Sequence, residues 1–191
     1  MKRQAFVHII AIGSALCLQP ALAGQYLGLD LGAQTIDQTR DTLQAAGSSF
    51  EDNYGYRGDM ALTLFKVSHF DKFAKLGSER EAWLSFAPDQ KLYRISMTWS
   101  DTGTTFKTLK DALDSKYGAP SQAGFGFESN YTYHDGKVEI VMSRNTFGFG
   151  NDQSTTLIYT YTPAVRAVDA MKAKIEAAIK KQNAAKAGGD L

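Results

Sequence analysis

The residues that most often carry out acid–base, nucleophilic or metal chemistry are scarce in this 191-residue chain, which contains three histidines and one cysteine. His69 lies beside Asp71 in the segment SHFDKF, and His134 lies in an expected hairpin turn. A zinc site needs three or four ligands at a recognisable spacing. His69 and His134 are far apart in the sequence and do not supply that set. We therefore expect no metal ion and no other cofactor.

Patterns typical of enzymes are also missing from the sequence. A Ser–His–Asp triad can be assembled from distant residues, but no Gly-x-Ser-x-Gly segment indicates one. The carboxylate pairs Glu79 with Glu81 and Asp111 with Asp114 have the side chains that glycoside hydrolysis uses, yet they fit solvated positions. The segments GDMAL and GFGFES lack the spacing of a phosphate-binding loop. We therefore expect a protein that is not an enzyme, and a hydrolase without a recognisable motif is our third hypothesis.

The candidate binding residues are aromatic. The segments GFGF and FGFG contain the pairs Phe125 with Phe127 and Phe147 with Phe149. Glycine beside an aromatic residue permits close approach of another ring or backbone, and we expect a β-hairpin to bring the four rings together at its open end. They form either a buried aromatic plug beneath a loop or an exposed apolar patch for a partner or a ligand.

Two helices are expected to position these segments. The first, in TIDQTRDTLQAAG, has Thr35 and Gln38 at the spacing of a capping box and Gly47 as its C-terminal stop. The second, in TFKTLKDALDSKYGAP, ends at Gly118 and Pro120. The apolar stripes expected to face the core are Ile36, Leu43 and Ala46 in the first helix and Phe106, Leu109, Leu113 and Tyr117 in the second.

Strand patterns and a last helix occupy most of the remaining chain. Residues 24–32 predict a short strand, and residues 81–87, 91–99 and 155–162 predict longer ones. In the strand at 91–99, Leu92, Arg94, Ser96 and Thr98 form one face and Tyr93, Ile95, Met97 and Trp99 the apolar face. Residues 164–185 predict an amphipathic helix with Val165, Val168, Met171, Ile175 and Ile179 on one side. The final eight residues are expected to fray.

A tyrosine motif occurs twice, in NYGYRGDMALTLF (53–65) and NYTYHDGKVEIVM (130–142). The two helices are offset by 70 residues, from 35 to 105, and the two motifs by 77. Two ordered matches at similar offsets predict a tandem duplication. The expected fold class is α+β, with a unit of about one strand, one helix and three antiparallel strands present twice. The expected domains are 24–102 and 103–163, followed by the C-terminal helix and tail at 164–191.

Hairpin geometry predicts which way the tyrosines point. In the second motif a turn at Asp135-Gly136 would pair Tyr133 with Val138 and Tyr131 with Ile140. A three-residue turn in the first motif would pair Tyr56 with Met60 and Tyr54 with Leu62. All these side chains then share one apolar face, which a helix would cover. The repeated motif is therefore interpreted as core architecture.

The N-terminal 23 residues resemble a cleaved secretory signal. Lys2 and Arg3 precede an apolar stretch, and Ala21 and Ala23 supply the small residues of a cleavage site. Leu16 before Cys17 does not fit a lipidation site, and the apolar stretch is too short to span a bilayer. Removal of residues 1–23 would also remove the only cysteine. We expect a periplasmic or secreted protein with no integral membrane segment.

A family resemblance supports this architecture. Leu31-Gly32 before the first helix, Gly47 after it and KYGAP (116–120) after the second are similar to segments of β-lactamase inhibitory proteins and of the SmpA/OmlA-type envelope module. The resemblance implies the tandem α+β topology. The paired cysteines of the inhibitors and the lipidation motif of the module are absent here.

Charge and compartment together shape the functional hypotheses. The formal charge of +1 becomes −1 once Lys2 and Arg3 are removed, and a near-neutral chain without a basic run is not expected to bind nucleic acid. Our first hypothesis is a non-catalytic exported module that binds another envelope or secreted protein. The alternative is a carrier or sensor of a small apolar ligand held between sheet and helices.

Overall fold

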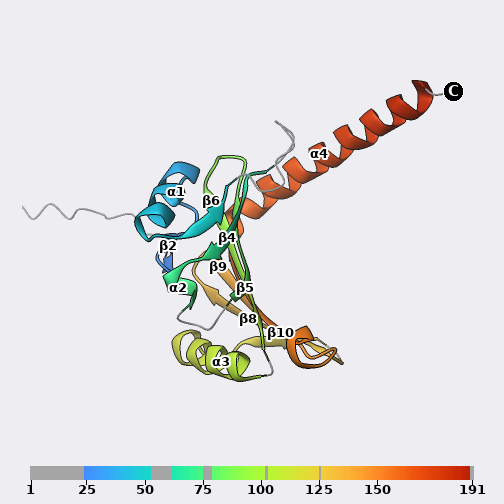
Figure 1. Ribbon diagram of the computed structural model, residues 1–191. Coiled ribbons are helices and arrows are strands. Elements are labelled where there is room, and N and C mark those ends of the chain that lie inside the picture. The colour runs from blue at the N-terminus through green and yellow to red at the C-terminus, as the bar shows by residue number, and fades with distance from the viewer. Residues whose placement is uncertain (1–23, 53–61, 75–78, 102, 125, 190–191) are drawn as a thin grey trace, which may run out of the picture.

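An eight-stranded antiparallel sheet forms the centre of the computed structural model, which describes residues 24–52, 62–74, 79–101, 103–124 and 126–189 (Figure 1). In spatial order the strands are β3 (Ser49–Glu51), β4 (Leu64–His69), β5 (Glu79–Phe86), β6 (Leu92–Ser100), β10 (Ser154–Tyr161), β9 (Val138–Asn145), β8 (Glu128–Asp135) and β7 (Ser121–Ala123). The expected strands at 81–87, 91–99 and 155–162 are all present.

The remaining elements surround this sheet. A small separate hairpin, β1 (Gln25–Tyr26) and β2 (Leu29–Asp30), precedes α1 (Ile36–Ala45). Further along lie the short helix α2 (Asp71–Ala74), α3 (Thr104–Tyr117), the single 3₁₀ turn η1 (Gly150–Asp152) and the long α4 (Thr162–Gly189). The fold class is α+β, as the sequence predicts.

The strand order is the same when read from either edge toward the centre. The helix α1 precedes the meander β3–β4–β5–β6, α3 precedes the meander β7–β8–β9–β10, and the two meanders meet where β6 pairs with β10. Each helix therefore precedes four strands rather than the expected three, and residues 24–32 form the separate hairpin rather than a strand of the main sheet. Both expected repeats contribute to one continuous sheet. The common origin of the two halves stays a prediction.

The register of the second tyrosine hairpin differs from the prediction by two residues. The turn residues are Gly136 and Lys137, so Tyr133 pairs with Ile140 and Tyr131 with Met142. A shift of two preserves the face of every side chain, because side chains alternate along a strand. Tyr133 is buried in the core, and Tyr131 packs against its edge. The predicted inward orientation of these two tyrosines is confirmed.

The first tyrosine hairpin cannot be described in the same way. Tyr54, Tyr56 and Met60 lie outside the described residues. Leu62 does not join the core cluster beneath α1 and α3 as predicted, because it packs with Ala87 and Val168 on the other face of the sheet. The prediction for Leu62 was therefore wrong.

The helices α1 and α3 cover one face of the sheet (Figure 1). The expected capping box at the start of α1 is confirmed, since Gln38 N donates to Thr35 Oγ1 and Thr35 N donates to Gln38 Oε1. Along α1 the stripe is Ile36, Thr39 and Leu43, and Ala46 is exposed instead of facing the core. The predicted stripe of α3 packs on the core at all four positions, Phe106, Leu109, Leu113 and Tyr117.

The helix α4 projects away from the sheet (Figure 1). Val168 is 1% exposed, whereas Ile179 further along the expected apolar side is 41% exposed. The predicted apolar side therefore contacts the sheet only near the start of the helix. The helix also continues to Gly189, beyond the expected end at 185 and into the tail that was expected to fray.

A buried carboxylate joins α3 to the central strand pair. Asp101 follows β6, is 5% exposed and accepts four hydrogen bonds. The donors are the Gly103, Thr105 and Phe106 backbone N–H groups at 2.8, 3.0 and 2.9 Å and the Thr155 hydroxyl of β10 at 2.7 Å. Burial alone would raise the pKa of the carboxyl, but these hydrogen bonds outweigh it and lower the pKa below its usual value. Asp101 thus caps the N-terminus of α3 and fastens it to β10.

Replacing Asp101 by asparagine should destabilise the protein. An amide lacks the negative charge, and its NH₂ group cannot accept a hydrogen bond. Some of the N–H and O–H groups that donate to Asp101 would therefore lose their acceptor. We expect Asp101→Asn to lower the free energy of unfolding by about 2–3 kcal/mol at pH 7, measured by urea denaturation. Asp111→Asn is the matched control, because the Asp111 carboxylate is exposed on α3, the helix that Asp101 caps. This substitution should have little effect on the free energy of unfolding.

The effect should depend on pH in a defined direction. Because the folded pKa of Asp101 is lowered, its contribution is fully present above the unfolded pKa of about 3.9. It is lost as the pH falls through the folded pKa. The stability difference between wild type and Asp101→Asn should therefore be largest near neutral pH and shrink below about pH 4. An equal difference at pH 7 and pH 2.5 would contradict the role given to the carboxylate.

Candidate functional site

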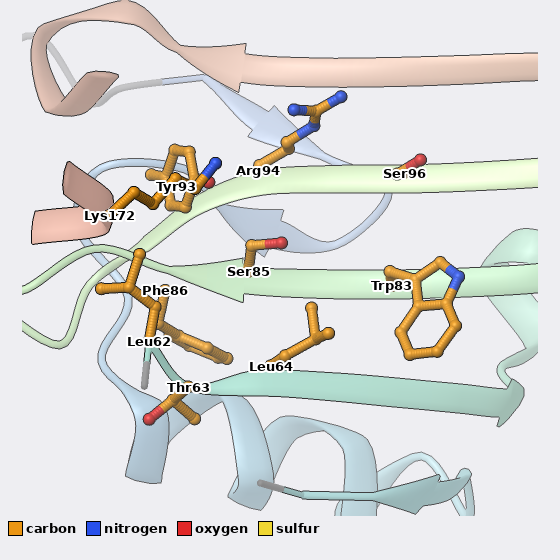
Figure 2. A pocket seen from close by; sticks show the side chains of 10 residues that line it. All are labelled: Leu62, Thr63, Leu64, Trp83, Ser85, Phe86, Tyr93, Arg94, Ser96 and Lys172. Carbon is orange, nitrogen blue, oxygen red and sulfur yellow. The ribbon is translucent and has the colours of Figure 1, made fainter. Parts of the chain in front are cut away.

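A groove of about 380 Å³ lies on the face of the sheet opposite α1 and α3. Its floor is formed by β4, β5 and β6, and the start of α4 borders one end (Figure 2). Ten described residues line it: Leu62, Thr63, Leu64, Trp83, Ser85, Phe86, Tyr93, Arg94, Ser96 and Lys172. Concave sites of this size with apolar walls and a few polar groups are typical of small-molecule binding.

A β-bulge shapes the end of the groove nearest α4. Ser85 pairs with Arg94 and Phe86 pairs with Leu92, so Tyr93 has no partner on β5. Tyr93 and its neighbour Arg94 consequently both line the groove face, although they are adjacent in sequence. Bulges often re-aim a side chain in this way beside functional sites. The sequence analysis assumed strict alternation and therefore placed Tyr93 on the apolar core face and Leu92 on the opposite face. Because of the bulge, both predictions were wrong.

Tyr93 anchors α4 to this face. Its side chain is 6% exposed and packs with Ala87 and Val168. Burial raises the pKa of its hydroxyl, the positive charge of Arg94 partly offsets this increase, and the negative charge of Asp169 adds to it. Tyr93 therefore stays neutral at ordinary pH, and it places the charged groups of β6 and α4 next to each other.

The charged residues that line the groove are both cations, Arg94 and Lys172. Within the described parts of the chain, no carboxylate lies within ion-pair distance of either side chain. Asp169 and Glu139 line an adjacent hollow on the β9–β10 side, which Arg94 and Lys172 also border. The main groove thus has a positive end near α4.

The other end of the groove is apolar and aromatic. Trp83 lies there, with Leu64 on the neighbouring strand between it and the α4 end (Figure 2). The Lys66 amine lies 5.5 Å from the centre of the Trp83 ring, and the indole N–H donates to Glu81 at 3.4 Å. These contacts hold the ring at the edge of the groove.

Three of the four phenylalanines predicted as binding residues, Phe127, Phe147 and Phe149, lie elsewhere, at the open end of the β8–β9 hairpin. Phe127 and Phe147 contact each other edge to face, with ring centres 5.6 Å apart. They are 61% and 67% exposed, and Phe149 is 93% exposed. Phe125 lies outside the described residues. The described members are therefore an exposed aromatic tip and not a buried plug.

The two described histidines lie apart from the groove. His69 at the end of β4 forms an exposed contact with Asp71 at 3.3 Å, and His134 is exposed and pairs with Glu139 across the hairpin. The nearby Ser68 hydroxyl donates to the Ser49 carbonyl and not to His69. Among the described residues no group of three histidine, cysteine, aspartate or glutamate side chains is arranged to hold a metal ion. No described helix combines the length and hydrophobicity of a membrane span.

Sequence reasoning did not single out the groove residues. Arg94 and Ser96 were assigned to the polar face of their strand, which is correct, but nothing placed Trp83 or Lys172 beside them. The sequence did contain one indication of the groove: Trp83, Ser85 and Ser96 alternate with the core residues of β5 and β6 and therefore share the opposite face. It becomes informative only once the order of the strands and the position of α4 are known.

Comparisons with known proteins identify a family but no activity. Residues 25–171 match the model of the TP0088 domain. A structural comparison matches a DUF4309 family protein, YjgB of Bacillus subtilis, at 18% sequence identity and a TM-score of 0.41, covering 72% of this chain and 85% of that one. No curated protein matches this chain.

The two tryptophans should report the two faces of the sheet separately. Trp99 is 1% exposed in the core, whereas Trp83 is half-buried at the groove. The Trp83→Phe variant should show blue-shifted emission and several-fold weaker quenching by acrylamide than the Trp99→Phe variant. Equal quenching of both variants would contradict the assignment of Trp83 to an open face.

Proposed function

This chain belongs to the TP0088 domain family, and we propose that it is a non-catalytic binding protein that holds a small, partly apolar molecule in the groove on the open face of its sheet. The observation that carries the proposal is the groove itself, with its volume of about 380 Å³ and its wall of Leu62, Leu64 and Trp83. Pockets of about 300–1,000 Å³ with apolar walls suit small organic ligands.

The groove favours binding over catalysis. No histidine, aspartate or glutamate is among its ten described lining residues, so it offers a ligand contacts but no ordinary general base. The hydroxyls of Ser85 and Ser96 add hydrogen-bonding groups to its floor. The small-ligand alternative from the sequence thus becomes the leading proposal, and the hydrolase remains the weakest. Export to the periplasm or the medium, proposed from residues 1–23, would make the ligand an extracytoplasmic one.

A second candidate function rests on the aromatic tip. Phe127, Phe147 and Phe149 are all more than half exposed, and clustered exposed aromatic residues are typical of protein interaction sites. This supports the original hypothesis of a partner protein from the envelope or the medium. The two sites lie on different parts of the sheet, so a single protein can use both.

Binding of a neutral apolar dye should separate the two candidates. We expect Nile red to bind the folded full-length protein with increased fluorescence. The Leu64→Asp variant should abolish this binding, because it places a charge on the groove wall. The double variant Phe127→Ser with Phe147→Ser is the matched control and should bind the dye as wild type does. Circular dichroism checks that all three proteins are folded.

The other outcomes distinguish the sites. Loss of dye binding only in the double variant would contradict the groove proposal and support the aromatic tip. Absence of dye binding to folded wild type would contradict an accessible apolar site at either place.

A further inference from the structure

The positive end of the groove indicates what kind of molecule it binds. We infer that the ligand is an amphipathic carboxylate whose acid group lies between Arg94 and Lys172 and whose apolar body extends along Leu64 toward Trp83. This inference rests on the proposed function, because it specifies the ligand of the same groove. The chemistry is that of a free organic acid with an aliphatic or aromatic body.

The first argument is the placement of the guanidinium. Arg94 lies on the groove face by the regular alternation of β6, and the bulge brings Tyr93 onto the same face. Arg94 is half-buried there and has no ion-pair partner among the described residues. A half-buried arginine beside an apolar wall is only partly solvated. A planar carboxylate can accept two parallel N–H bonds from it, which makes it a well-matched ligand group.

The second argument is the convergence of two elements on one end of the groove. Lys172 comes from α4 and Arg94 from β6, and both line the same cavity. Asp169 and Glu139 line the adjacent hollow, which Arg94 and Lys172 also border. The described lining residues of the groove therefore carry positive charge and no carboxylate, which complements an anion.

The third argument is the position of the two cations along the groove. Lys172 lies at the α4 end and Arg94 next to Ser85, its cross-strand partner, whereas Trp83 lies farther from α4 with the Ser96 hydroxyl beside it (Figure 2). An amphipathic molecule matches this order only when its acid group lies at the α4 end. The opposite orientation would place the carboxylate beside Leu64 and Trp83, away from both cations among the described lining residues.

Paired fluorescent probes test the inference directly. The full-length protein is titrated with 11-(dansylamino)undecanoic acid and with the methyl ester of the same compound, which has the same apolar body and no charge. We expect the acid to bind at least tenfold more tightly than the ester. Arg94→Gln should weaken acid binding about tenfold and leave ester binding unchanged, and Lys172→Gln should have the same sign of effect.

Controls separate the carboxylate contact from the fold and from general charge. Lys174→Gln lies on the same helix, is exposed and does not line the groove, so it should bind both probes as wild type does. Arg94→Lys keeps the charge and should restore part of the preference for the acid. If Arg94→Gln failed to fold, the comparison of acid and ester on wild type would still decide the question.

Two failures have different meanings. Equal affinity of wild type for acid and ester would overturn the carboxylate inference while leaving the groove proposal intact. A folded wild type that binds neither probe would overturn the inference together with the proposed function.

Discussion

The main sheet has two faces to cover, and α1 and α3 cover only one of them. The large side chains of both meanders gather on that covered face, where Phe65, Trp99 and Met142 are essentially buried. Among the described helices, α4 packs on the opposite face with its first turns, through Val168. Burial of apolar area drives folding, so this division leaves one side as the structural core and the other available for a ligand. The groove is a consequence of that one-sided packing.

Two local devices keep this arrangement fixed. Asp101 holds the start of α3 against the central β6–β10 pair through its hydrogen bonds to Phe106 and Thr155, and thereby keeps the covered face closed. On the open face the bulge turns Tyr93 toward α4, next to Arg94, which lines the groove. The same strand, β6, therefore joins the two halves through its pairing with β10 and also contributes Arg94 to the groove.

The sequence predicts the elements better than it predicts the site. Helix stripes such as Leu109 with Leu113, and the Thr35 capping box, are local patterns that tertiary contacts preserve. The predicted hairpin turn was one residue too early, which changed the cross-strand pairing by two residues. Gly136 can occupy either turn position, and the structure uses it first, at a φ of +57°. The bulge at Tyr93 leaves no mark in the alternation of its strand. Trp83, Arg94 and Lys172 meet through strand order and helix docking, which no local pattern encodes.

The central claim, that the open face of the sheet is the ligand site, is tested most directly by NMR of methyl-labelled protein during titration with the dansyl acid. The account predicts that the methyl resonances of Leu62, Leu64 and Val168 shift together with the Trp83 indole resonance, whereas those of Leu84 and Leu157 on the covered face stay in place. Unchanged resonances of Leu62, Leu64 and Trp83 at saturating probe would contradict it.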